Sequence, residues 1–138
     1  MASKLDTLER VEVTSRAQWR AWLKKHHTRA QGIWLVHWKK ARPDKFIGYD
    51  AIVEEALCFG WIDSLPRKLD EERTMLYLSP RKPKSVWSKL NKDRIIHLEA
   101  TGLMTEAGRA KIDAAKRDGT WTTLDAVETM AMPDELTN

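Results

Sequence analysis

The sequence has few of the residues that most often reveal a catalytic or metal-binding function. Its single cysteine, Cys58, excludes an intrachain disulfide and, with no histidine near it in sequence, is expected to be an inert buried thiol. The six glycines stand singly and mostly follow predicted helices, so there is no glycine-rich phosphate loop. Cys-x-x-Cys, His-Glu-x-x-His and acidic calcium-loop patterns are also absent. We therefore expect no catalytic residues of a recognisable pattern, no metal and no cofactor.

Long apolar runs are absent as well. No stretch of about eighteen apolar residues occurs, so no membrane insertion is expected. The N-terminus has no basic region before an apolar run, which argues against a signal peptide and favours a cytoplasmic location. We predict a single domain over 1–138, with an extended lead-in at 1–13 and an acidic tail at 122–138.

What the sequence does contain is a series of short elements with clear boundaries. Ser15, followed by Gln18 three residues later, predicts the start of a helix that runs to His27. Strands are predicted at 32–39, 61–65 and 74–79, with a possible short edge strand at 11–13. The first of these strands is apolar on both faces, and Pro66 is expected to end the second.

Three more helices are expected, at 50–59, 85–101 and 105–118. Asp50, Ser85 and Thr105 are the side chains predicted to cap their N-termini. A glycine follows the last residue of each of the three helices, and glycine suits the left-handed position that ends a helix. The elements together predict an α+β fold, with a small antiparallel sheet of about three strands, four or five helices and a helical C-terminal half.

Positive charge is concentrated in one segment. The chain has a net charge of +4, and residues 81–97 hold six Lys or Arg against a single acidic residue, Asp93. That segment nets +5, so the rest of the chain nets −1. Such an uneven distribution favours a local anion site over a basic coat.

The basic segment also places unlike side chains on one stripe. Trp87, Asn91 and Arg94 recur at helical spacing in the predicted helix 85–101, and Ser88 lies alongside. An indole, an amide and a guanidinium in one stripe could hold a planar or anionic ligand by stacking and bidentate contact. The pattern therefore indicates a candidate binding surface.

A structural interpretation of the same residues remains open. Trp87 could belong to the core, as the seven tryptophans of the chain suggest. Asn91 could satisfy a buried backbone group, and Arg94 could pair with Asp63 or Glu54.

Asp63 is the second candidate. It lies on the predicted strand 61–65, on the same face as Trp61 and Leu65, and a carboxylate in such surroundings is costly unless it is paired. An ion pair with Arg81 or Arg94 is one interpretation. A ligand-orienting or acid/base role is the other.

Several segments together resemble a known family. They are Trp19-Arg-Ala-Trp-Leu23, Ile33-Trp-Leu-Val36, the run Glu54-Glu-Ala-Leu-Cys-Phe-Gly-Trp-Ile-Asp-Ser64, and Ser85-Val-Trp-Ser-Lys-Leu-Asn91. They resemble the YdeI/OmpD-associated family, also called bacteriocin-protection proteins, from about Trp19 to Trp121. The resemblance implies protection against antimicrobial peptides and association with an outer-membrane porin, and it supplies no catalytic residues. Longer members continue into a basic helical unit, so it also implies a short form.

These observations favour a non-enzymatic cytoplasmic binding protein for a small anionic or peptide ligand, with a role in stress or antimicrobial-peptide protection. The candidate pocket consists of Trp61, Asp63, Arg81, Ser85, Trp87, Ser88, Asn91 and Arg94. Two alternatives stay open. One is an enzyme that uses Asp63 with an arginine holding an anion, and the other is nucleic-acid binding through residues 81–94.

Overall fold

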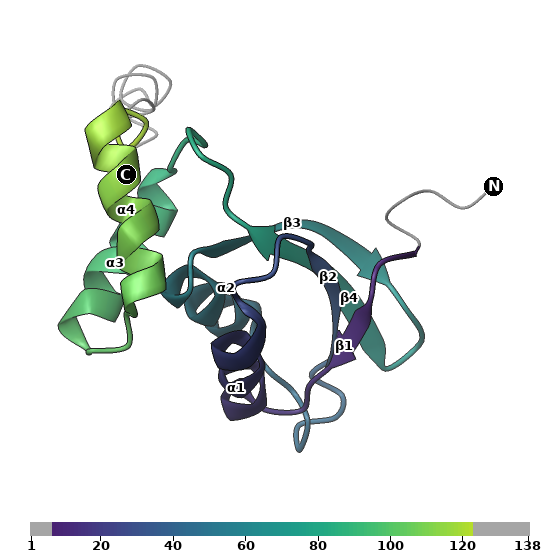
Figure 1. The fold of residues 1–138 in the computed structure, drawn as a ribbon. Helices are drawn as coiled ribbons and strands as arrows, with labels where there is room; N and C mark the ends of the chain where they lie inside the picture. Colours follow the sequence, from purple (N-terminus) through teal and green to yellow (C-terminus); the bar gives the residue numbers. More distant parts are fainter. Residues whose placement is uncertain (1–6, 123–138) are drawn as a thin grey trace, which may run out of the picture.

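The computed structural model describes residues 7–122 of the chain (Figure 1). Within that range the protein has a four-stranded sheet and four helices, which confirms the α+β class and the helical C-terminal half. The elements in chain order are β1 (Arg10–Glu12), α1 (Arg16–His26), β2 (Ile33–Trp38), α2 (Tyr49–Cys58), β3 (Trp61–Lys68), β4 (Arg73–Pro80), α3 (Lys89–Ala100) and α4 (Glu106–Asp118).

The sheet has the strand order β1-β2-β4-β3 and is mixed rather than purely antiparallel. β1 runs parallel to β2, with Val11 opposite Leu35, because α1 carries the chain back between the two strands. β4 is antiparallel to both of its neighbours, and Leu78 lies between Ile33 on β2 and Asp63 on β3. The strands predicted at 61–65 and 74–79 are therefore antiparallel neighbours in the sheet.

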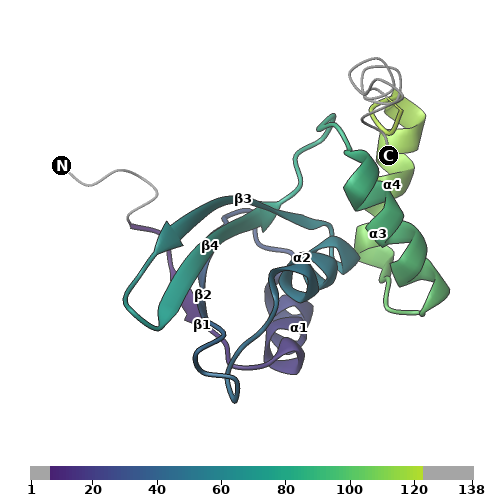
Figure 2. The same ribbon diagram turned by 180° about the vertical axis from the view of Figure 1, so that it is seen from behind.

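Both faces of β2 are largely buried, as the apolar residues on its two faces predict. Leu35 and its neighbours on one face belong to the large core under α1 and α2, the two helices that cover that side of the sheet (Figures 1 and 2). Trp34 and Val36 on the other face form a smaller cluster with Leu8 and Met75. The sheet thus separates two apolar layers of unequal size.

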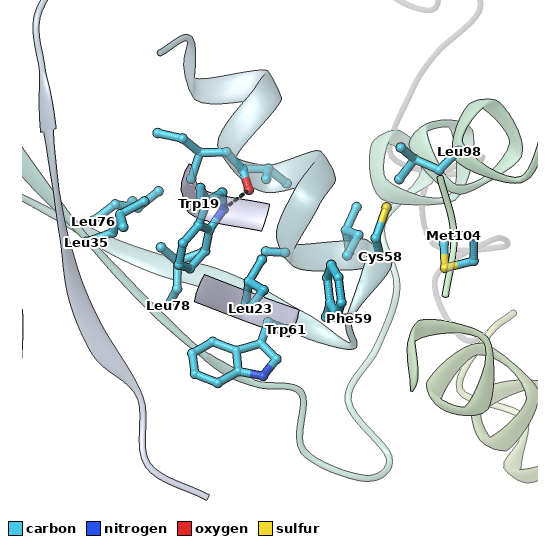
Figure 3. Packing of buried hydrophobic residues seen from close by; sticks show 14 of the residues in the cluster. Trp19, Leu23, Leu35, Cys58, Phe59, Trp61, Leu76, Leu78, Leu98 and Met104 are labelled. Atoms are coloured by element: carbon cyan, nitrogen blue, oxygen red, sulfur yellow. Dashed lines mark hydrogen bonds between the residues drawn. The ribbon is translucent and has the colours of Figure 1, made fainter. Parts of the chain in front are cut away.

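The first helix is anchored at its predicted cap and through one tryptophan. The Ser15 hydroxyl accepts a hydrogen bond from the backbone N–H of Gln18. Trp19 is fully buried, and its indole Nε1 donates to the carbonyl oxygen of Ile52 at 3.0 Å (Figure 3). This bond ties α1 to α2 and satisfies the one polar atom of the ring.

The boundaries on either side of α2 differ from the prediction. The helix begins after Gly48, so Asp50 is not its cap and lies in the first turn, where the carboxylate pairs with Arg94. β3 does not end at Pro66 but runs to Lys68. Proline is tolerated there because β3 is the edge of the sheet, where a missing backbone donor leaves no central ladder broken.

A bulge in β3 changes the direction of its side chains. Asp63 pairs with Leu78 and Leu65 pairs with Tyr77, so Ser64 is an extra residue without an opposite partner in the ladder. Leu65 therefore shares the face of Tyr77, while Asp63 stays on the face that α2 covers. The prediction that Asp63 and Leu65 point the same way is wrong, because strict alternation does not hold across a bulge.

The last two helices form a hairpin beside the end of α2 (Figures 1 and 2). α4 follows the prediction, with Thr105 as its cap and Gly119 in the left-handed conformation at its end. It packs closely on α2 at Gly108, where an added Cβ would lie 2.5 Å from the carbonyl oxygen of Cys58.

The start of α3 was predicted three residues too early. Ser88, not Ser85, caps the helix, and its hydroxyl accepts from the backbone N–H of Asn91. Residues 81–88 form a loop that carries the chain from the sheet to the helical hairpin (Figure 1). Trp87 therefore precedes the helix, so the predicted stripe of Trp87, Asn91 and Arg94 on one helix does not form.

The predicted acidic tail lies, from residue 123 onward, outside the described residues. Before that point, Trp121 packs against Trp87, with ring centroids 5.2 Å apart. In the part of the chain that the structure describes, no helix is long and apolar enough to cross a membrane.

Candidate functional site

Arg81 stands immediately after β4, and its backbone is held from two sides. Its N–H donates to the carbonyl oxygen of Gly60 at 2.8 Å. Its own carbonyl oxygen accepts from Nζ of Lys111, on α4, at 2.8 Å. The turn between α2 and β3 and the last helix therefore position this residue together.

The side chain of Arg81 is buried without a counter-charge. It is 5% exposed, and its guanidinium carbon lies 3.6 Å from the centre of the Trp87 ring. Nη2 donates to the carbonyl oxygen of Val86 at 2.6 Å, whereas Nε is buried with no hydrogen-bond partner. Among the described residues no carboxylate pairs with it.

Burial lowers the pKa of Arg81 to about 10 because no nearby negative charge offsets the loss of water. The group is still a cation at neutral pH. An arginine buried in this way is uncommon, since charged side chains are rarely buried unless they are paired. Stacking on Trp87 recovers only part of the lost hydration.

A small pocket of about 90 Å³ opens at this arginine, between the loop 81–88 and α4. Its wall carries four cationic side chains and one carboxylate, Asp118, with hydroxyls from Ser85 and Thr120. The cations are Arg81, Lys82, Lys84 and Lys111. Asp118 is already engaged, because its Oδ1 accepts from both the backbone N–H and the hydroxyl of Thr120. The pocket is therefore strongly positive.

The structure brings together three of the residues predicted for the site: Arg81, Ser85 and Trp87. It assigns Trp61 to the core, fully buried and donating from its indole nitrogen to the carbonyl oxygen of His27 at 3.0 Å. Ser88 acts as a helix cap.

Asp63 and Arg94 belong to a different network. The phenol of Tyr49 donates to Asp63, while Arg94 pairs with Asp50 at 2.6 Å. Arg94 also donates to the side-chain oxygen of Asn91 at 3.0 Å. The predicted ion pairs of Asp63 with Arg81 or Arg94, and of Arg94 with Glu54, are wrong, because Tyr49 and Asp50 at the start of α2 supply the partners.

Sequence reasoning missed Lys111 and Tyr49. Lys111 sits on the polar face of α4, which reads as solvated until the helix is placed against the loop 81–88. Tyr49 stands next to the expected helix start, where nothing distinguishes it from a surface residue. Cys58 is buried as expected, and that burial raises its pKa to about 11, which leaves the thiol protonated and unreactive at neutral pH.

Residues 11–111 match the family model described as Domain of unknown function (DUF8412). The chain belongs to this family. The DUF8412 match runs from β1 into α4 and ends at Lys111, so it includes Arg81, Trp87 and Asp63 but not Asp118. No curated protein and no solved structure matches the chain. The DUF8412 description states no activity, and the resemblance to the YdeI/OmpD-associated family stays a prediction.

Proposed function

We propose that the chain is a non-enzymatic cytoplasmic binding protein that holds the oxyanion group of a small ligand against Arg81. The group would be a phosphate or a carboxylate, and a peptide could present one through its C-terminus. The cytoplasmic location rests on the sequence, whose lone cysteine suits a reducing compartment. A role in protection against antimicrobial peptides rests on the family resemblance alone.

One observation carries the proposal: Arg81 is a buried cation without a carboxylate partner among the described residues. An uncompensated buried charge is destabilising, and a protein that keeps one at a pocket has a use for it. A bound anion would supply the missing charge and could accept from Nε, the guanidinium nitrogen that has no partner.

The size and lining of the pocket favour a single oxyanion group. A volume of about 90 Å³ has room for a few water molecules or for one oxyanion group. Lysines at its rim would attract an anion from solution, while the buried arginine would fix its orientation. The ligand would thus be recognised by one charged group.

The position of the acid supports the non-enzymatic assignment. An enzyme of the predicted kind would need Asp63 beside an arginine that holds an anion. Asp63 lines a different pocket from Arg81, and it accepts a hydrogen bond from Tyr49. No other carboxylate than Asp118 lines the pocket at Arg81, and Asp118 is held by Thr120.

The test is a titration with inorganic phosphate at constant ionic strength, followed by calorimetry and by the melting temperature. Wild type should bind saturably, and a ligand at about 100 times its Kd should add roughly 2.7 kcal/mol of stability. Arg81→Met keeps an apolar stem over Trp87 and should abolish binding. Arg94→Met removes an arginine that is also largely buried but is paired with Asp50, so it is the matched control and should bind phosphate like wild type.

Two outcomes would contradict the proposal. One is the absence of saturable phosphate binding to wild type. The other is equal loss in the Arg81 and Arg94 variants. Oligonucleotide binding that depends steeply on salt and persists in Arg81→Met would instead favour nucleic-acid binding through the exposed lysines.

A further inference from the structure

A second pocket, of about 470 Å³, lies on the face of the sheet that α2 covers. Three strands and the first residue of α2 contribute to it, so its walls are regular structure rather than loops. The lining residues are His37 from β2, Asp63, Ser64 and Pro66 from β3, Thr74, Met75 and Leu76 from β4, and Tyr49. Pockets of this volume hold small organic molecules.

Most polar oxygens in this pocket are left with no hydrogen to donate. The Tyr49 hydroxyl already donates its hydrogen to Asp63. The Thr74 hydroxyl already donates its hydrogen to the carbonyl oxygen of Arg67, at 3.1 Å. The Asp63 carboxylate can only accept. A ligand that fits this pocket must therefore bring donors.

His37 adds a further polar atom without a partner. Its Nδ1 is buried and has no hydrogen-bond partner in the described part of the chain. Burial lowers the pKa of His37, so the imidazole is neutral at neutral pH and one of its nitrogens is an acceptor. His37 lies opposite Thr74, and Asp63 lies opposite Leu78, four residues further along β4. The two side chains therefore mark separate ends of the pocket, about 13 Å apart along the strand.

We propose that this pocket binds a small, extended primary-amine ligand, whose ammonium group donates to Asp63 and whose other end donates to His37. The ammonium supplies both the donors that the oxygens need and the positive charge that Asp63 lacks. Asp63 is the one formal charge in the lining, so an anion is disfavoured. Arg94 is close to Tyr49, but its charge is offset by Asp50. Pro66 and Leu76 suit the methylene groups of such a ligand.

The site does not have the composition of a metal centre. Among the described residues no group of three or more His, Cys, Asp or Glu is placed to hold a metal ion. The proposal is also separate from the anion site, because Arg81 does not line this pocket.

1,6-Diaminohexane, a primary diamine long enough to reach from Asp63 to His37 when extended, is the probe, titrated by calorimetry at constant ionic strength. The chain has a net charge of +4, so a diamine has no general attraction to it and binding reports a specific site. Wild type should bind saturably. Asp63→Asn keeps the acceptor for Tyr49 but removes the charge, and should weaken binding at least about tenfold.

Glu99→Gln is the control, because Glu99 is a carboxylate on α3 that pairs with Arg109, is 40% exposed and does not line the pocket. It should bind 1,6-diaminohexane like wild type, and so should Arg81→Met, which separates this proposal from the anion site. His37→Phe should reduce the affinity for 1,6-diaminohexane to that of hexylamine, which has one amine. The proposal is overturned if wild type shows no saturable binding, or if Asp63→Asn binds as tightly as wild type.

Discussion

Within its described residues the protein has two buried charged side chains, and they differ in whether the fold supplies a partner of opposite charge. Glu55 is 2% exposed and is held by Arg16 at 2.5 Å and by Arg20 at 2.7 Å. Arg81 is 5% exposed and has no carboxylate partner among the described residues. The charge of Glu55 is neutralised within the fold, and its ion pairs tie α1 to α2. The charge of Arg81 is not neutralised by any described carboxylate, so it is available to a ligand.

The largest effect should come from removing the satisfied charge. Glu55→Gln leaves Arg16 and Arg20 facing a buried neutral amide, and breaking a buried pair costs about 3–5 kcal/mol. Urea unfolding measures the change. Glu54→Gln is the control, since Glu54 is 21% exposed and pairs with Arg16 at 3.1 Å, and it should lose no more than about 1 kcal/mol. Equal losses would show that Glu55 is no special anchor.

Gly60 supplies the carbonyl that holds the backbone of Arg81, and its φ of +78° places it in the left-handed region. Gly60→Ala should cost about 1–2 kcal/mol for the backbone and more for its contact, because the new Cβ would lie 2.8 Å from Cγ of Lys111. Gly102→Ala has a φ of +77° but nothing within 4 Å of the added atom.

Unfolding in urea should therefore rank Gly60→Ala as the worse variant. The Gly60 variant should also bind phosphate more weakly, since Lys111 lines the anion pocket. If the two glycine variants lose the same free energy, the close packing of α4 at this turn does not contribute.

Removing the unsatisfied charge should have a small effect on stability. Arg81→Met gives up the bond to the Val86 carbonyl, worth about 1 kcal/mol, and also removes a desolvated cation. The free energy of unfolding in the absence of anion should change by less than about 1 kcal/mol, or rise. A loss as large as that of Glu55→Gln would make Arg81 structural and end the contrast.

His37 is a further titratable side chain that is partly buried, and it differs from Glu55 and Arg81 because burial keeps it neutral. Its pKa is lowered by burial, so below the unfolded value of about 6.5 the unfolded chain binds a proton that the folded chain does not. Stability should therefore fall as the pH drops from 7 to 5. His37→Phe should reduce that fall by less than about 1 kcal/mol in urea unfolding at the two pH values. An unchanged slope would contradict the assignment.

Much of the fold could be predicted from local pattern. The two-sided apolar strand at β2, the Ser15 cap and the glycine that ends α4 each depend on residues close in sequence. The bulge at Ser64 and the late start of α3 could not be predicted. Both depend on how β3 fits β4 and how loop 81–88 reaches the hairpin, which are contacts between distant segments.

The candidate site was predictable in part for the same reason. The basic segment identified Arg81, Ser85 and Trp87, because its charge and aromatic content are visible in one window. The pairing of Asp63 and of Arg94 was not, since both partners come from the start of α2. A sequence can reveal that a charge needs a partner, but the fold decides which charge is left without one.

The side-chain N–H signal of Arg81 Nε offers the most direct test of the central claim. It can be followed by two-dimensional ¹⁵N NMR and assigned by its loss in Arg81→Met. If Arg81 is a buried cation that lacks an anion, this signal should shift saturably with inorganic phosphate at constant ionic strength, while that of Arg94 stays in place. A stationary Arg81 signal across the full titration would contradict the account.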